Sequence, residues 1–319
     1  MIKARIATVI SVSTLLLFAA SFASAQLRLP RPSQGASVTQ TIGVTDITIN
    51  YSRPAVKDRT IFADAPGTMA ARAKGEGTLD DQNQRVKGEP IVPYGHVWRT
   101  GANEATQFAV TDDVLINGQK LPAGKYSLST IPGKDEWTVI FNSDYGQWGS
   151  FTYDEKKDVL RVKTKPQWVS DNQELLLYSF EPTADNAATV NIRWEKVRVP
   201  FTVQVDVVGT TLAKARKAIA EAKPDDWRTP YQAAGFAKQN NDMADAGAWI
   251  DAALKAIDTT IAAKPTFQNL SAKTSILLAA GRKDEAFATA DKAIAQGKAD
   301  KADTAAFEKR IADVKAGKM

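Results

Sequence analysis

Alternating apolar and polar residues dominate the first two thirds of the chain. Residues 47–51, 137–141 and 197–207 place Ile, Val, Phe, Trp or Tyr at every second position. A period of two with one apolar face is typical of half-buried antiparallel strands. Asn117 and Gly118 separate two apolar runs and predict a hairpin turn, whereas the nearly continuous apolar run at 175–180 predicts a central strand. We therefore predict an antiparallel β-sandwich over residues 37–208.

A different pattern begins at residue 209, where Ala, Lys, Asp and Glu become the main residues. Helical segments are predicted at 211–222, 231–237, 248–257, 270–280, 286–294 and 304–315. Segments 253–257 and 290–294 resemble each other, and Gly281 occupies a turn between two of the helices. Residues 209–319 thus predict a tetratricopeptide-like helical-repeat region, which makes the chain α+β. The array is short for a free-standing one, so docking of its helices on the β-domain and a separate arm both remain open.

The first 25 residues have the features of a secretory signal peptide. Lys3 and Arg5 precede an apolar run, and residues 23–25 read A-S-A, a pattern of small residues at a cleavage site. The run is short for a membrane span, which favours cleavage over a membrane anchor. We expect a mature chain that begins at Gln26 with an extended leader over 26–36. It would be soluble in the periplasm or outside the cell, without stable membrane insertion.

The composition of the chain excludes several kinds of site and argues against one class of partner. The chain has no cysteine, which excludes disulfides, thiolate metal sites and a lipid-modified N-terminus. Its formal net charge of +5 falls to +3 without Lys3 and Arg5, and this small, evenly spread charge argues against nucleic-acid binding. Residues 64–89 are poor in large apolar side chains and predict a mobile insertion in the sandwich. A solvated loop and a lid over the segment that follows both remain open for this insertion.

Polar chemistry is concentrated in residues 92–106, which read V-P-Y-G-H-V-W-R-T-G-A-N-E-A-T. We expect Gly95 and Gly101 to adopt positive φ angles. Alternation along a strand places Trp98 in the core and Arg99 on the opposite face. These features predict the rim of a site at a strand end.

A small polar or anionic ligand is the expected occupant of this rim. The guanidinium of Arg99 suits a carboxylate or phosphate, and it also suits an ion pair with Glu104. The predicted binding residues are Arg99, Asn103, Glu104, Thr106, Arg53, Tyr51 and Tyr94. A buried network of Arg99, Asn103 and Glu104 that only braces the loop is an equal alternative.

Catalysis is a further alternative, since His96 and Glu104 are candidates for the acid and base of a hydrolase or lyase. No complete catalytic motif accompanies them, so a non-enzymatic binding protein is preferred. We expect no cofactor and no metal, although oxygen ligands from Glu104, Asp112 and Asp113 leave a cation site open. Among the aromatic residues, Trp137 and Trp194 are predicted to be core and Trp148 to be exposed.

Six sequence blocks carry a family resemblance, and two of them are the short blocks P-S at 32–33 and Q-W-G at 147–149. The four longer ones are I-T-I-N-Y-S-R-P at 47–54, V-W-R-T-G-A-N-E-A-T at 97–106, L-P-A-G-K-Y-S-L at 121–128 and W-T-V-I-F-N at 137–142. Through them, residues 38–165 resemble the bacterial family called DUF2911. The resemblance implies the β-domain and the choice of site but no activity, and relative to this family residues 64–89 look inserted.

The resulting hypothesis is an exported protein with two modules. The sandwich binds a small polar or anionic ligand, and the helical tail binds a protein partner. A hydrolase or lyase, and a purely structural protein whose motif is an internal brace, are the alternatives.

Overall fold

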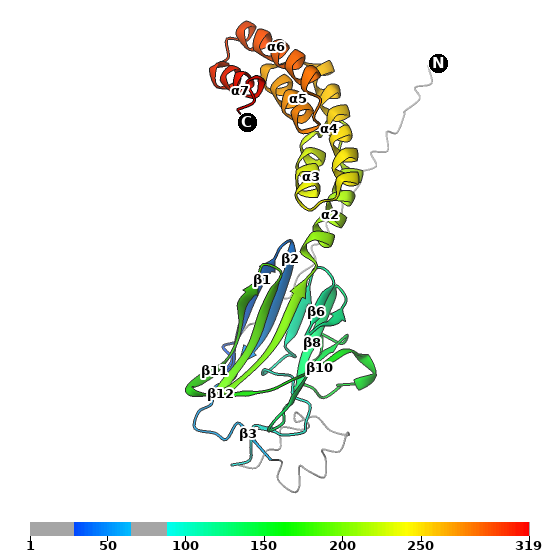
Figure 1. Ribbon diagram of the computed structural model, residues 1–319. Helices are drawn as coiled ribbons and strands as arrows, with labels where there is room; N and C mark the ends of the chain where they lie inside the picture. Colours follow the sequence, from blue (N-terminus) through cyan, green and yellow to red (C-terminus); the bar gives the residue numbers. More distant parts are fainter. Residues whose placement is uncertain (1–28, 65–87, 319) are drawn as a thin grey trace, which may run out of the picture.

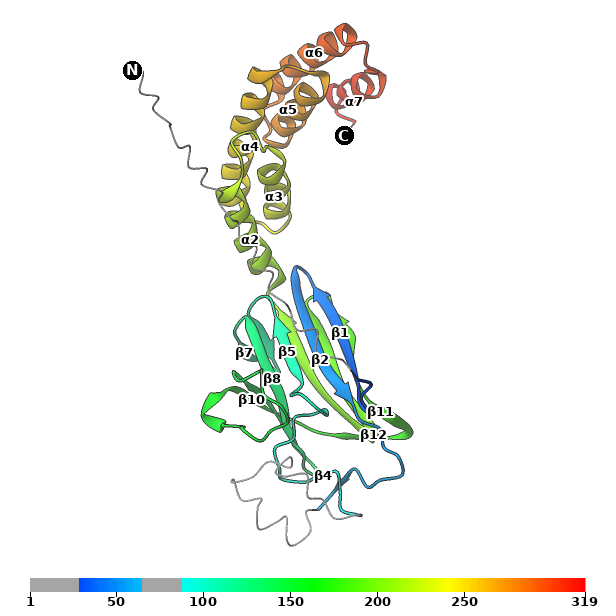
Figure 2. The same ribbon diagram turned by 180° about the vertical axis from the view of Figure 1, so that it is seen from behind.

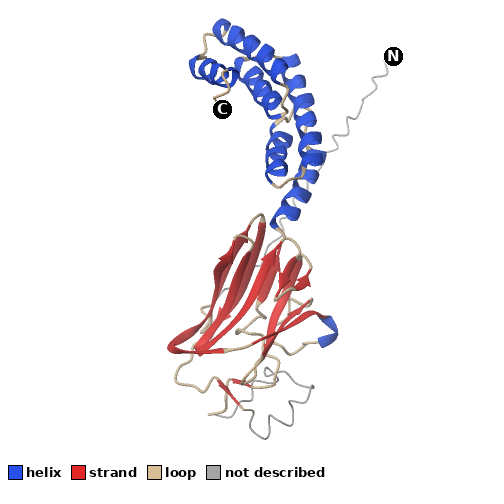
Figure 3. Cartoon of the chain, in the orientation of Figure 1, coloured by secondary structure: helices blue, strands red, loops and turns tan. Residues whose placement is uncertain are grey.

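The computed structural model describes residues 29–64 and 88–318. The predicted signal peptide, the start of the leader and most of the predicted insertion at 64–89 lie outside these residues. A strand-rich region is followed by helices, as the colouring by secondary structure in Figure 3 shows. The predicted α+β class, with antiparallel strands first and helices second, is confirmed.

Two antiparallel sheets form the β-domain (Figures 1 and 2). The larger sheet has the order β1 (Gln34–Ile42), β2 (Thr45–Arg53), β5 (Gln107–Val110), β8 (Gly124–Ile131), β9 (Trp137–Asn142) and β10 (Asp158–Thr164). The smaller sheet has the order β11 (Gln167–Ala184), β12 (Ala187–Val205), β6 (Val114–Ile116) and β7 (Gln119–Leu121). The short strands β3 (Phe62–Ala63) and β4 (Val92–Pro93) form a separate parallel pair.

One apolar core lies between the two sheets. Ile47 and Phe108 from the larger sheet and Phe201 and Val203 from the smaller one are buried in the same cluster. They occupy alternate positions of their strands, so the period of two in the sequence corresponds to burial against the opposite sheet. Trp137 and Trp194 are also buried there, as predicted.

The turn prediction is confirmed, whereas the prediction of a central strand is wrong. Asn117 and Gly118 join β6 to β7 with φ angles of 46° and 80°, the pair of positive angles that a type I′ turn requires. Residues 175–180 belong to β11, which lies at the edge of its sheet. The segment after β2 covers this edge, because Leu176 N donates to Pro54 O at 3.0 Å and Val56 N donates to Glu174 O at 2.9 Å. This cover explains why an edge strand is so apolar.

Six helices follow in the described part of the chain. They are α2 (Val207–Glu221), α3 (Arg228–Gln239), α4 (Met243–Ala263), α5 (Phe267–Ala279), α6 (Lys283–Ala299) and α7 (Ala305–Lys315). Consecutive helices pack against one another, and each predicted segment overlaps one of them, although α4 extends five residues before and six residues after its predicted segment. Asp206 caps α2 by accepting a hydrogen bond from Gly209 N at 2.9 Å, so the helical region begins close to the predicted boundary. No helix in residues 29–64 and 88–318 is long and apolar enough to cross a membrane.

The helices extend from one end of the sandwich as an arm and do not pack along its sheets, which decides between the two arrangements that the sequence left open (Figure 1). Contact with the sandwich is concentrated at α2. There Lys214 Nζ donates to Val44 O and to Asp112, both at 2.7 Å, and Val207 packs closely on Gly43. The arm buries its own apolar residues in three separate clusters, which explains why it needs no support from the sheets.

Candidate functional site

The motif at 97–106 forms a loop whose two ends are hydrogen-bonded to β8. Trp98 and Thr130 exchange two backbone hydrogen bonds of 2.8 Å at one end, and Leu128 N donates to Thr106 O at 2.7 Å at the other. The residues between these anchors, 99–105, are referred to below as the site loop. Its two ends are therefore fixed on the central part of the larger sheet.

Side chains of the motif itself hold the site loop closed. Trp98 Nε1 donates to Gly101 O at 3.2 Å, and Thr106 Oγ1 donates to Thr100 O at 2.9 Å. The buried hydroxyl of Tyr178, from the opposite sheet, donates to the same Thr100 oxygen at 2.9 Å. Trp98 is only 3% exposed, which confirms its predicted place in the core. Thr106, predicted to bind ligand, thus lies in the internal network of the loop.

The backbone of the loop differs from the prediction at Gly101. Positive φ angles occur at Gly95, Thr100 and Asn103, but Gly101 is not among the residues that have one. A Cβ atom at Gly101 would lie 2.6 Å from Thr106 Oγ1, so close packing explains the glycine. Asn103 has a φ of 60°, a conformation that Asn tolerates better than most residues. Its Nδ2 donates to Ser33 O and Ser52 Oγ, both at 3.1 Å, which ties the loop to the leader and to β2.

The two predicted residues on β2 contact the opposite sheet. Arg53 Nε donates to Leu176 O at 2.8 Å, and Tyr51 Oη accepts from Tyr178 N at 3.2 Å. The rings of Tyr51 and Tyr178 meet edge to face at 4.6 Å between centroids. Both Arg53 and Tyr51 therefore help to join the two sheets.

His96 and Tyr94 lie in the turn that follows β4. His96 is 4% exposed, whereas Glu104 is exposed, and no hydrogen bond or ion pair joins the two within the described residues. The expected acid–base pair is not assembled, because the imidazole is buried away from the carboxylate. Burial also lowers the pKa of His96 and raises that of Tyr94, where the nearby charge of Asp64 adds to the effect.

The single histidine provides a pH test. Its pKa is lower in the folded than in the unfolded state, so the unfolded chain binds this proton more readily. The free energy of unfolding should therefore fall as the pH drops below about 6.5, and the loss should be complete below the folded pKa. We expect the one imidazole resonance to titrate below the usual range in NMR spectra. Urea unfolding of a His96→Gln variant should show a weaker dependence on pH between about pH 7 and pH 5. Equal dependence in both proteins would contradict the assignment.

Glu104 is the exposed polar residue of the site loop. Arg31 Nη1 donates to its two carboxylate oxygens at 2.6 and 2.8 Å. The guanidinium of Arg31 also lies over the ring of Trp148, 5.4 Å from its centroid. Trp148 is 53% exposed, in agreement with the prediction. A carboxylate, a guanidinium and an indole thus lie together on the surface.

A groove of about 1380 Å³ opens beside Glu104. Residues 29–37, 50–52, 104, 105 and 107 line it. This Glu104 groove includes Tyr51 and Glu104 from the predicted binding set, whereas Arg99 is half-buried and does not line it. Arg31 and Gln107 are lining residues that the sequence did not single out. The lone arginine between Pro30 and Pro32 was the available signal for Arg31.

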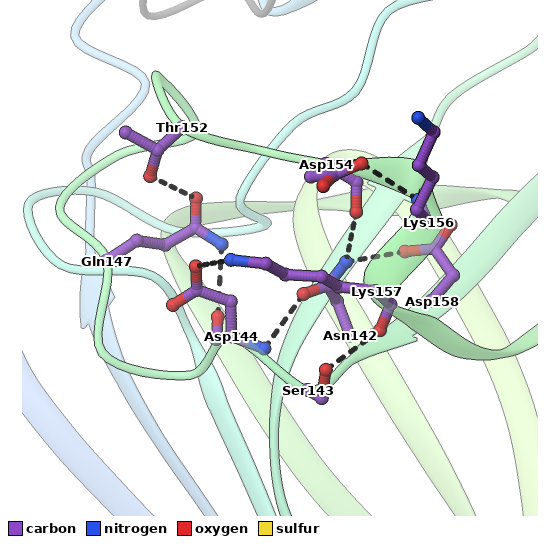
Figure 4. Close-up of polar contacts among 9 residues, drawn as sticks. All are labelled: Asn142, Ser143, Asp144, Gln147, Thr152, Asp154, Lys156, Lys157 and Asp158. Carbon is purple, nitrogen blue, oxygen red and sulfur yellow. Dashed lines mark hydrogen bonds and ion pairs between the residues drawn. The ribbon is translucent and has the colours of Figure 1, made fainter.

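The loop between β9 and β10, residues 143–157, is built on the buried side chain of Asn142 (Figure 4). Asn142 Nδ2 donates to Asp154 O at 2.9 Å and to Asp158 Oδ1 at 2.7 Å, and its Oδ1 accepts from Asp144 N at 2.9 Å. Gln147 Nε2 donates to Asp144 O at 3.0 Å. These bonds fix the path of a long connection that would otherwise be free to move.

This β9–β10 loop crosses the end of the sheet and joins the site loop. Ala105 N donates to Gln147 O, and Gly149 N donates to Asn103 O, each at 3.0 Å. The two bonds place Trp148 directly opposite the site loop. The motif therefore positions an aromatic residue from a distant part of the chain.

The cation site that the sequence left open at Glu104, Asp112 and Asp113 is not assembled in the described part of the chain. Asp112 accepts from Lys214 and Thr45, and Asp113 accepts from Ala123 N at 2.9 Å and pairs with Lys120 at 2.8 Å. Within the described ranges, no three acidic or imidazole side chains gather as a metal site.

The sequence was compared with models of known protein families, with curated proteins and with solved structures. Residues 33–73 and 78–203 match the family described as "Protein of unknown function (DUF2911)". The match covers both sheets, the site loop and the β9–β10 loop, and it ends before the helices. The matched stretches include residues 64–73 and 78–89 of the predicted insertion, and residues 74–77 lie outside the match. No curated protein and no solved structure matches the chain.

Proposed function

The chain belongs to the DUF2911 family, and from that premise we propose that it is an exported binding protein with two modules. The sandwich binds a small polar ligand in the Glu104 groove, and the helical arm binds a protein partner. The observation that carries this proposal is the groove itself. It lies beside the family motif and is lined by residues from three separate parts of the chain.

The side chains of the groove favour a polar ligand over a strongly anionic one. Ser37, Asn50 and Gln107 supply uncharged hydrogen-bonding groups, and the charges of Arg31 and Glu104 compensate each other at 2.6 Å. An exposed pair of this kind contributes roughly 0–1 kcal/mol to stability, so a ligand can open it at little cost. Concavity together with a few convergent polar groups is what small-molecule sites require.

The two alternatives account for less of the site. A hydrolase or lyase would need the buried His96 to approach the exposed Glu104. A purely structural brace accounts for Trp98, Thr100 and Thr106, but it offers no reason for an open groove beside Glu104.

Ligand binding is tested by amide chemical-shift mapping with four probe classes: neutral oligosaccharides, amino acids, dicarboxylates and inorganic phosphate. At least one class should shift the resonances of residues 31–37, 50–52 and 104–107, and Glu104→Gln should weaken that response. Glu181→Gln is the matched control, because Glu181 forms a similar exposed pair with Arg198 at 2.7 Å on the other sheet. If no probe perturbs the groove, the proposal is wrong.

Export is proposed from the first 25 residues. Intact mass and N-terminal sequencing of the protein from its host should identify a mature chain that begins at Gln26. Recovery of a chain that retains Lys3 and Arg5 in the membrane fraction would contradict it.

A protein-binding role for the arm is proposed from its tetratricopeptide-like succession of helix pairs. A second hollow of about 700 Å³ supports it, since Trp227, Arg228 and Lys264 line this hollow where α3, α4 and α5 meet. A photo-crosslinking residue at position 227 should form one discrete adduct in the host, whereas the same residue at position 298, on α6, should not. Identical adduct patterns at both positions would count against the hollow as the contact site.

A further inference from the structure

The β9–β10 loop carries three large aromatic side chains that face solvent. Tyr145, Trp148 and Phe151 are 45%, 53% and 51% exposed. Most other aromatic residues of the sandwich are buried in its core, so this clustering within seven residues of one loop is unusual for the domain. Exposed aromatic groups that gather in this way mark interaction sites more often than isolated ones do.

The backbone of the loop that carries these rings is held in place before any ligand arrives. Asn142 fixes its base, and the backbone bonds of Gln147 and Gly149 to the site loop fix its middle. A further bond, from Gln107 Nε2 to Tyr145 O at 3.1 Å, connects a lining residue of the groove to the same loop. A ring on a backbone fixed by such contacts can stack on a ligand with less loss of conformational entropy than one on a mobile loop.

The aromatic loop and the Glu104 groove share Arg31. Its guanidinium lies 5.4 Å from the centroid of the Trp148 ring and 2.6 Å from the carboxylate of Glu104, and Arg31 lines the groove. The exposed indole of Trp148 therefore lies beside a groove whose polar groups are amides, hydroxyls and one balanced ion pair. The complementary ligand has one flat apolar face and many neutral hydroxyl groups.

We propose that this combined surface binds the pyranose rings of a neutral saccharide. The apolar face of one ring stacks on Trp148, and the ring hydroxyls bond to Glu104 and Gln107. Binding displaces Arg31 from Glu104, after which the carboxylate accepts from two neighbouring hydroxyls. This inference rests on the proposed function, because it names the ligand class of the same groove.

The experiment compares wild-type protein with two tryptophan variants. Isothermal titration uses soluble chitotriose, cellotriose and maltotriose, and co-sedimentation uses insoluble chitin and cellulose. Binding of the trimers alone assigns the site to short saccharides, and co-sedimentation with a polymer assigns it to a polysaccharide chain. Either result supports a saccharide site.

Trp148→Ala should weaken saccharide binding at least about tenfold while the melting temperature stays near that of the wild type. Trp168→Ala is the matched control, since Trp168 is 60% exposed on β11 of the other sheet and should leave affinity unchanged. Equal affinity of wild type and Trp148→Ala would overturn the stacking site.

The two proposals fail in different ways. If amino acids, dicarboxylates or phosphate shift the groove resonances and no saccharide binds, the saccharide inference is overturned and the ligand-binding function stands. If neither saccharides nor the other probes perturb the groove, both are overturned.

Discussion

A Trp98→Ala variant is expected to lose about 3–5 kcal/mol of the free energy of unfolding. Trp98 is 3% exposed, and its ring stacks on Trp194 at 5.6 Å and meets Phe62 at 6.0 Å between centroids. The truncation removes this packing, leaves a cavity and takes away the indole that donates to Gly101 O. Urea unfolding, followed by circular dichroism, measures the loss.

Trp148→Ala and Trp168→Ala serve as controls for this variant. Both side chains are more than half exposed, so each change should alter the unfolding free energy by only about 0.5 kcal/mol. A Trp98→Ala protein as stable as these two would mean that the motif does not anchor the site loop in the core.

An Asn142→Ala variant should lose about 2–4 kcal/mol of unfolding free energy. The side chain of Asn142 has no exposed surface and satisfies groups at Asp144, Asp154 and Asp158. Alanine leaves a backbone carbonyl and an amide at the base of the loop without these partners, and burial makes that costly. Hydrogen exchange of residues 143–157 should accelerate more than that of the β1–β2 hairpin.

Asn172→Ala is the control, because Asn172 is exposed on β11. It should have almost no effect on stability or on exchange. If Asn142→Ala left the exchange of the β9–β10 loop unchanged, the loop would not depend on this network, and the pre-formed aromatic surface would lose its basis.

Much of the architecture could be predicted from local patterns. The alternation at Ile47 and Ile49 indicated half-buried strands, and the opposite faces of Trp98 and Arg99 agree with their burial. A prediction from local pattern was wrong where residues distant in the sequence determine burial. Residues 175–180 are apolar at a sheet edge, because the segment around Pro54 and Val56 covers that edge.

The candidate site was predictable only in part. The sequence singled out the motif and the exposed Trp148, but several predicted ligand residues have internal partners instead. Thr106 closes its own loop and Arg53 joins the two sheets. Residue type shows which hydrogen bonds a side chain can form, and the folded arrangement determines with which group it forms them.

The sequence by itself determined the order of strands and helices, the start of the helical region and the core position of Trp98. Each depends on spacing between residues close along the chain, and burial acts on that spacing directly. The tertiary structure decided that residues 29–37, 50–52, 104, 105 and 107 line one groove, and that residues 143–157 reach it across the end of the sheet. Local periodicity carries no information about such partners, because strand pairing and loop docking depend on the energy of the whole fold.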